Sequence, residues 1–219
     1  MTGGVKYESG FSNDTTRARR IEDGATRHSL AEDCRTAALA FMSGVARGWD
    51  KLELALWLTG PYAHATRHAA HGERVVAPGA SNDVVDPVLV ERLLTRVRGQ
   101  VLASLEKASL DLGTLDFTDE MVARGFVRQL SDGEGAAVWV PVDRPRLRLK
   151  DRLQALFAAD HLDAPYSYGE LFVCHRCEAV VFDAHAKRQG VCGAHRLSGR
   201  APSNDNAPLS DPYARLMGR

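Results

Sequence analysis

Two short pairs of metal-binding residue types near the C-terminal end constrain this chain more than any other feature. Cys174 and Cys177 form a C-x2-C pair, and Cys192 and His195 form a C-x2-H pair. A gap of two residues lets one tight turn present both side chains to a single ion, so two such turns supply four ligands. Three thiolate sulfurs and one imidazole nitrogen are a typical ligand set for tetrahedral Zn²⁺. The sequence therefore predicts a bound zinc ion held by these four side chains.

Apolar runs on both sides of the first pair predict a small β-hairpin around it. Leu171–Val173 precedes the pair and Val180–Phe182 follows it. Together with both ligand pairs, the stretch over residues 170–197 resembles the generic zinc-ribbon or treble-clef pattern. The resemblance implies a fold held together by metal and implies no activity. Because four ligands fill a tetrahedron, no position is left for a water molecule, and we expect the zinc to be structural.

Other interpretations of these residues stay open at this stage. The four cysteines of the chain could pair as disulfides or be unrelated thiols. A cytoplasmic location disfavours disulfides, because thiols are kept reduced there. His175 and His185 are alternatives to His195, although neither lies in the second turn. Glu178 could serve a catalytic zinc as general base, but the H-x-E motif of the zinc deaminases does not precede the first pair, so we interpret it as a solvated strand residue.

A run of histidines is the second candidate for metal binding. His64, His68 and His71 follow one another at i, i+4 and i+7 of a short helix that the sequence predicts over residues 62–72. On a helix these positions share one face and could direct two or three imidazoles at one ion, which would be the centre of a metal-dependent enzyme. The run lacks the Glu of H-E-x-x-H. We therefore favour the polar face of an Ala-rich helix.

The central part of the chain has the periodicity and the capping residues of helices. Ser29 with Glu32 predicts the start of a first helix, whose apolar face includes Cys34. Asp50 with Glu53 predicts a second helix that runs to Leu58 and is stopped by Gly60-Pro61. Asp86-Pro87 is a strong start signal for a third helix over about residues 87–109. Its apolar stripe consists of Val90, Leu93, Leu94, Val97, Val101, Leu102 and Leu105.

Further along, Thr118 begins a short helix, and two strand-like runs flank a Gly-rich turn to give a hairpin near residues 126–142. Pro145 then opens another helix. The predicted fold class is α+β: a mostly helical core with a β-hairpin and a small C-terminal module of zinc-ribbon or treble-clef type.

Composition divides the chain into four parts. Residues 1–28 and 198–219 are poor in large apolar side chains, so we expect a flexible N-terminal arm and a flexible C-terminal tail. Residues 29–162 form the predicted helical core, and residues 163–197 form the zinc-knuckle module. We expect the module to pack on the helices, because the connection is rich in apolar and aromatic side chains. These are Leu162, Tyr166, Tyr168 and Leu171.

Charge and hydropathy exclude some classes of partner. Lys plus Arg and Asp plus Glu are both 28, so the net charge is zero, which argues against a nucleic-acid coat or a polybasic membrane binder. No apolar run approaches the length of about 18 residues that spans a bilayer. The N-terminal residues lack the apolar core of a secretory signal. We therefore expect a cytoplasmic protein with no membrane partner.

One local concentration of basic residues keeps nucleic acid as an alternative partner. Residues 144–152 are predicted to open a helix, and the preceding residues 118–142 have the order of a winged-helix recognition element and wing. Against this, the recognition helix would be short and would carry Asp119 and Glu120. The candidate contacts are Arg144, Arg146, Arg148, Lys150 and Arg152.

Phosphate-binding loops, dinucleotide fingerprints and nucleophile elbows are all missing from the sequence. Our leading hypothesis is therefore a non-enzymatic cytoplasmic interaction or regulatory protein with a structural zinc site and an unidentified protein partner. A DNA- or RNA-binding regulator that uses the basic 144–152 segment and the zinc module is the first alternative. A metal enzyme built on the histidine run is the second.

Overall fold

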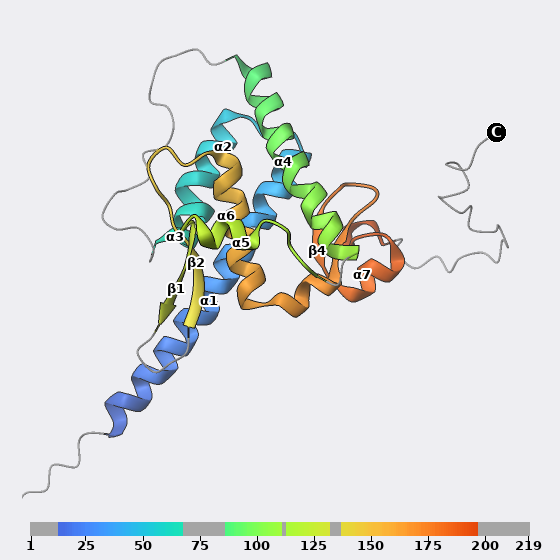
Figure 1. The fold of residues 1–219 in the computed structure, drawn as a ribbon. Helices are drawn as coiled ribbons and strands as arrows, with labels where there is room; N and C mark the ends of the chain where they lie inside the picture. Colours follow the sequence, from blue (N-terminus) through green and yellow to red (C-terminus); the bar gives the residue numbers. More distant parts are fainter. Residues whose placement is uncertain (1–12, 68–85, 111–112, 132–136, 197–219) are drawn as a thin grey trace, which may run out of the picture.

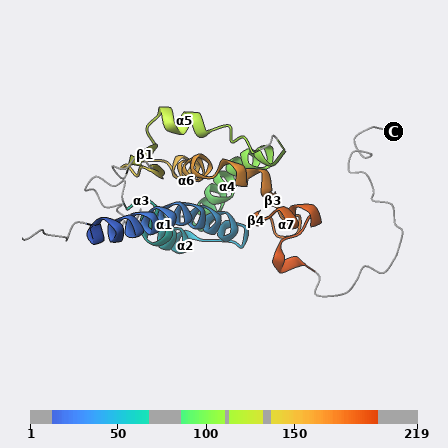
Figure 2. The same ribbon diagram turned by 90° about the horizontal axis from the view of Figure 1, so that it is seen from below.

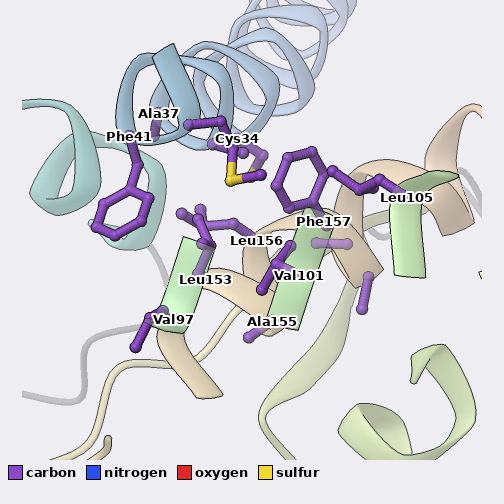
Figure 3. Close-up of a cluster of buried hydrophobic side chains, with 14 of the residues drawn as sticks. Cys34, Ala37, Phe41, Val97, Val101, Leu105, Leu153, Ala155, Leu156 and Phe157 are labelled. Carbon is purple, nitrogen blue, oxygen red and sulfur yellow. The ribbon is translucent and has the colours of Figure 1, made fainter. Parts of the chain in front are cut away.

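Three helices that are far apart in the sequence form the centre of the molecule. The computed structural model describes residues 13–67, 86–110, 113–131 and 137–196 (Figure 1). Helices α1 (Asn13–Ala46), α4 (Pro87–Leu110) and α6 (Leu149–Asp163) pack against one another. Their shared core is drawn in Figure 3, where Cys34 of α1 lies among side chains of the other two helices. The fold is mostly helical with two small antiparallel hairpins, which agrees with the predicted α+β class.

Helix α6 is the central helix of this core. Every residue from Leu153 to Asp160 is buried, so the helix has almost no solvent-facing side. Helix α1 covers it on one side, while helices α4 and α5 (Thr118–Ala123) and the first hairpin contact it from others. Its small residues Ala155, Ala158 and Ala159 are fully buried and let the neighbouring elements approach closely.

Helix α1 begins earlier than the sequence predicts. It starts at Asn13 rather than at Ser29, so Ser29 lies inside the helix and residues 13–28 belong to it instead of to a separate arm. Residues 13–28 contain no proline and only one glycine, Gly24. Once the later turns of α1 are fixed by packing, helix propagation through such a stretch meets no obstacle. In Figure 1 this first part of α1 extends away from the rest of the molecule.

The second helix is capped as predicted, but Gly60-Pro61 does not interrupt the helical path as predicted. The carboxylate of Asp50 accepts hydrogen bonds from the amides of Leu52 (2.8 Å) and Glu53 (3.0 Å) at the start of α2 (Lys51–Trp57). Instead of stopping at Pro61, the chain continues through a π-helical turn (Leu58–Tyr62) into α3 (Ala63–Thr66). The wider turn accommodates the proline, which has no amide hydrogen to donate.

Helix α4 agrees closely with its prediction. The carboxylate of Asp86 accepts a hydrogen bond from the amide of Val88 (2.9 Å), and Pro87 occupies the first helical position. Most of the predicted apolar stripe is buried, but Leu93 is 48% exposed. The buried residues of the helix are Val90, Leu94, Val97, Arg98, Val101, Leu105 and Ala108.

The first hairpin has the predicted position and packs on α6. Strands β1 (Val127–Ser131) and β2 (Ala137–Pro141) are antiparallel, with Val127 opposite Pro141. The amide of Trp139 on β2 donates to the carboxylate of Asp163 at the end of α6.

The next helix starts later than the sequence predicts. Helix α6 begins at Leu149 and not at Pro145. Arg146 has a left-handed backbone (φ 65°), which a right-handed helix cannot include. The predicted basic helix is therefore wrong in its first part, where the chain forms turns.

The C-terminal module packs on the core as expected. A 3₁₀ turn (Pro165–Glu170) leads into strands β3 (Leu171–Val173) and β4 (Val180–Phe182), then α7 (Ala184–Gln189) and a last 3₁₀ turn (Gly193–His195). Its side chains Tyr168, Leu171 and Val180 belong to the same buried cluster as residues of α1, α4 and α6. Figure 2 shows β3, β4 and α7 together at one end of the helices.

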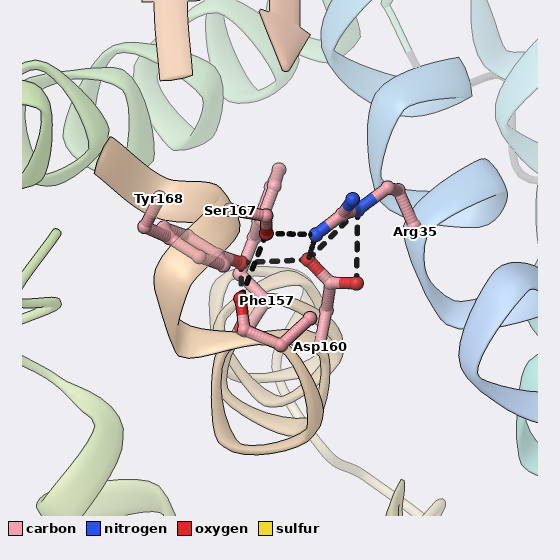
Figure 4. A network of polar contacts seen from close by, with 6 residues as sticks. Arg35, Phe157, Asp160, Ser167 and Tyr168 are labelled. Carbon is pink, nitrogen blue, oxygen red and sulfur yellow. Dashed lines mark hydrogen bonds and ion pairs between the residues drawn. The ribbon is translucent and has the colours of Figure 1, made fainter. Parts of the chain in front are cut away.

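A buried polar network fixes this arrangement (Figure 4). Arg35 of α1 donates from Nε and Nη2 to the carboxylate of Asp160 on α6, with N–O distances of 3.0 to 3.2 Å. The same guanidinium donates to the Ser167 hydroxyl and lies 4.0 Å above the ring of Phe182 on β4. Tyr168 donates its hydroxyl to Asp160 (2.9 Å). One network therefore joins α1, α6 and the C-terminal module.

Candidate metal centre

The four predicted ligands come together in the structure. Cys174 follows β3, and Cys177 lies in the turn of the hairpin. Cys192 directly precedes the last 3₁₀ turn, and His195 is its last residue. The ligand atoms all lie within 4.8 Å of one another. Cys174 and Cys192 are buried, whereas Cys177 and His195 are half-buried. Four soft ligands from two turns thus form a group that could hold a metal ion.

Three of the six distances between the ligand atoms are close to the edges of a tetrahedron. Metal–ligand distances of about 2.3 Å to sulfur and 2.0 Å to nitrogen give edges of about 3.8 Å between sulfurs and 3.5 Å between sulfur and nitrogen. The Sγ atoms of Cys177 and Cys192 are 3.7 Å apart. The Nδ1 atom of His195 lies 3.7 Å from Sγ of Cys174 and 3.2 Å from Sγ of Cys192. The cluster therefore has room for one zinc-sized ion.

Local backbone geometry builds the two ligand turns. In the first turn, the amide of Cys174 donates to the carbonyl of Ala179 (2.9 Å), and the amide of Glu178 donates back to the carbonyl of Cys174 (2.8 Å). Between the turns, Asp183 caps the start of α7, and Gly190 ends it with a left-handed backbone (φ 70°). A glycine at that position reverses the chain toward the second turn without steric cost.

The electrostatics of the cluster favour a thiolate at Cys174. Burial by itself would raise the pKa of this thiol, but backbone amides of Cys192, Arg176 and Cys177 donate to the sulfur and lower its pKa to about 6. Burial raises the pKa of Cys177, and the neighbouring sulfurs of Cys174 and Cys192 raise it further. Without a cation, neighbouring thiolates disfavour one another. A bound cation stabilises several thiolates at once.

Glu178 is exposed to solvent, as the sequence suggests, but it lies in the turn before β4 and not on a strand. It adopts a left-handed backbone (φ 53°) directly after Cys177. Its carboxylate Oε2 accepts from Nη1 of Arg98 (2.7 Å), and its carbonyl accepts from Nη2 (2.7 Å). The prediction missed Arg98. The available signal was its position four residues after Leu94 in the apolar stripe of α4, where a charged side chain requires a partner.

In the part of the chain that the structure describes, the other candidate histidines do not join the cluster. His175 lies edge-on to the ring of Phe172, with centroids 5.6 Å apart, and His185 is exposed. In the histidine run, His64 is exposed on α3, with Nδ1 3.2 Å from Nη1 of Arg67. His68 and His71 lie outside the described residues, so the second metal site stays a prediction.

Cys34 is a core residue as predicted. Its side chain is fully buried, and burial, with the nearby carboxylate of Asp160, raises the pKa of the thiol far above its usual value.

The basic segment divides into side chains with different surroundings. Arg152 is largely buried, forms an ion pair with Asp143 and lies 5.2 Å from the ring centre of Tyr62. Arg144 donates to the carbonyl of Gly125, and Lys150 is half-buried. Arg146 and Arg148 point into solvent, although Arg148 approaches Asp151 at 3.7 Å. These five side chains therefore do not form one basic helix face.

Comparisons with known proteins do not extend this picture. The chain matches no protein-family model, no curated protein and no solved structure. Among the helices of the described residues, none has the length and apolar character needed to cross a membrane.

Proposed function

We propose that this chain is a non-enzymatic interaction or regulatory protein in which Cys174, Cys177, Cys192 and His195 bind one structural Zn²⁺. The observation that carries the proposal is the cluster itself, whose ligand atoms all lie within 4.8 Å of one another, with three pairs close to tetrahedral edge distances. The order of hairpin, helix and second ligand turn supports a module of zinc-ribbon or treble-clef type. The proposal includes a cytoplasmic location, where cysteines stay reduced and available to metal.

A structural role fits the ligand set better than a catalytic one. Three sulfurs and one nitrogen complete the coordination of zinc, and a catalytic zinc keeps one position open for water. Glu178, the nearest carboxylate in the sequence, accepts from Arg98 of α4 and so has a structural partner in the helical core.

The exposed apolar side chains favour a protein as the partner over nucleic acid. Two short stripes of large apolar side chains are exposed, one on α2 and one on the first half of α4. A protein partner would remove such surface from water. By contrast, Arg152 of the basic segment is neutralised by Asp143 and largely buried. The exposed stripes consist of Leu52 and Leu56 on α2, and Val88, Leu89 and Leu93 on α4.

Elemental analysis of the purified, untagged chain tests the metal site. We expect one zinc per chain, and we expect Cys174→Ser or Cys192→Ser to lose it while the far-UV signal of the helices is largely kept. Cys34→Ala and His175→Ala are matched controls, because each removes a cysteine or histidine outside the cluster. Both controls should keep one zinc per chain.

Two results would contradict the proposal. One is a wild-type chain that contains no zinc and takes up none when the metal is added to the reduced protein. The other is a Cys174→Ser chain that binds zinc as tightly as the wild type. A second metal equivalent that is lost in a His64→Ala/His68→Ala variant would instead support the metal-enzyme alternative.

A further inference from the structure

Arg98 is a buried cation at the boundary between the helical core and the metal cluster. Its side chain is 9% exposed, and all the acceptors described for it lie on other elements. Nε donates to the carbonyl of Met42 near the C-terminal end of α1 (2.9 Å). Nη1 and Nη2 donate to the carboxylate and the carbonyl of Glu178. A buried guanidinium is stable only while its donors are paired, so these contacts are structurally important.

Two of the three acceptors depend on the geometry of the first ligand turn. Glu178 directly follows the ligand Cys177, and its amide is bonded to the carbonyl of Cys174. Its left-handed backbone is unfavourable for a residue with a side chain and persists only when the surroundings enforce it. The ligand turn on one side and Arg98 on the other supply that constraint.

We propose that Arg98 is a positioning residue for the metal: through Glu178 it holds the first ligand turn in its binding geometry, and metal occupancy in turn stabilises the contact between α1 and α4. The proposal rests on metal binding at the Cys174, Cys177, Cys192 and His195 cluster. Groups that orient metal ligands affect affinity strongly even though they do not touch the ion. Because coupling between two equilibria is reciprocal, a contact that strengthens metal binding is itself strengthened by the metal.

A second contact between the module and the core provides a matched control. Lys187 of α7 donates from Nζ to the carbonyls of Ser109 (2.8 Å) and Gly169 (2.8 Å). This lysine also joins the module to α4, but at the C-terminal end of the helix, and neither of these two acceptors lies in a ligand turn. A variant at Lys187 therefore weakens the docking of the module without touching Glu178.

Zinc affinity, measured by competition with a chromogenic chelator, tests the proposal on the full chain. We expect Arg98→Met to weaken zinc binding by about 10- to 100-fold, the range found for residues that orient metal ligands. Glu178→Gln keeps the backbone carbonyl and a side-chain oxygen but loses the charge, so a smaller loss is expected. Lys187→Met should leave the affinity unchanged.

Hydrogen exchange with and without zinc supplies the second readout. In the wild type, removal of zinc should speed amide exchange at Met42–Ala46 of α1 and around Arg98 on α4, as well as in the ligand turns. In Arg98→Met, removal of zinc should still speed amide exchange in the ligand turns. It should no longer change amide exchange in α1.

Three results distinguish a failure of the proposed role of Arg98 from a failure of the proposed metal site. Unchanged zinc affinity in both Arg98→Met and Glu178→Gln would overturn this inference while the metal site stands. An α1 response that persists in Arg98→Met would also overturn it, because the apolar contacts of β3 and β4 would then carry the coupling. A wild-type chain without zinc would instead refute the proposed function. If Arg98→Met does not fold, Glu178→Gln alone decides, and its unchanged affinity counts against the proposal.

Discussion

Replacing Asp163 by asparagine should stabilise the protein in a pH-dependent way. Burial, followed by a smaller effect of the nearby carboxylate of Asp160, raises the pKa of Asp163 from 3.8 to about 6, although the amide of Trp139 donates to it and opposes the rise. The folded chain therefore holds a proton on Asp163 over a pH range in which the unfolded chain has lost it. Stability from this group is greatest below the unfolded pKa and decreases as the pH rises through about 6.

The size of the effect follows from the shift and from the exposure of the side chain. A change in pKa from 3.8 to about 6 corresponds to about 3 kcal/mol between the two protonation states. Because Asp163 is only half-buried, solvent screening reduces the contribution of this shift to the free energy of unfolding to about half of that value. The asparagine side chain would keep an oxygen to accept from the amide of Trp139 and would carry no charge. We therefore expect Asp163→Asn to raise the free energy of unfolding by about 1.5 kcal/mol at pH 8 and by about half as much at pH 5.

Urea denaturation followed by far-UV circular dichroism at the two pH values measures this difference. Asp116→Asn is a suitable control, because Asp116 is 47% exposed and only 3.9 Å from Lys107 in a loose surface pair. Its effect should be small and nearly independent of pH. An Asp163→Asn chain that is no more stable than wild type at pH 8, or whose gain is equal at both pH values, would show that the buried charge is not the cause.

Two further predictions concern packing and the buried network. A Cβ at Gly44 would overlap the indole ring of Trp49, whereas a Cβ at Gly99 in α4 would meet no atom within 4 Å. Gly44→Ala should therefore cost about 2 kcal/mol, and Gly99→Ala should gain about 0.5 to 1 kcal/mol, as measured by urea denaturation; equal effects would contradict the packing of Trp49. Arg35→Met should cost about 3 kcal/mol at neutral pH, because it leaves the buried Asp160 without its cation. Burial already raises the pKa of Asp160, so this loss should shrink toward pH 5, and a loss independent of pH would argue against an unpaired carboxylate.

The sequence predicts best where local chemistry alone decides the structure. The start of α4 depends on the Asp86 carboxylate and on Pro87, and both act within a single turn. The cap of α2 by Asp50 is local in the same way. The metal cluster belongs to this group too, because each two-residue gap fixes one turn.

Predictions fail where distant contacts override a local signal. Pro61 is a helix breaker by propensity, yet the burial of Trp57 and Tyr62 against the core carries the chain past it in a π-helical turn. Trp57 also donates from Nε1 to the carbonyl of Ala37 on α1, a partner 20 residues away. The pairing of Arg98 with Glu178 spans 80 residues, and no spacing rule relates the two positions.

The central position of α6 has a consequence for how the chain acquires its structure during synthesis. Arg35 meets its partner Asp160 only across 125 residues, and the apolar face of α1 is covered by a helix that is made much later. Trp49 and Trp57 can contact Phe41 soon after α1 is made, but the surface around Cys34 has no α6 to pack against until much later. Long-range contacts of this kind slow folding and leave apolar surface exposed while the chain waits. A nascent chain that ends before α6 should therefore be protease-sensitive and should bind chaperones, and protection should appear abruptly once α6 has left the ribosomal tunnel.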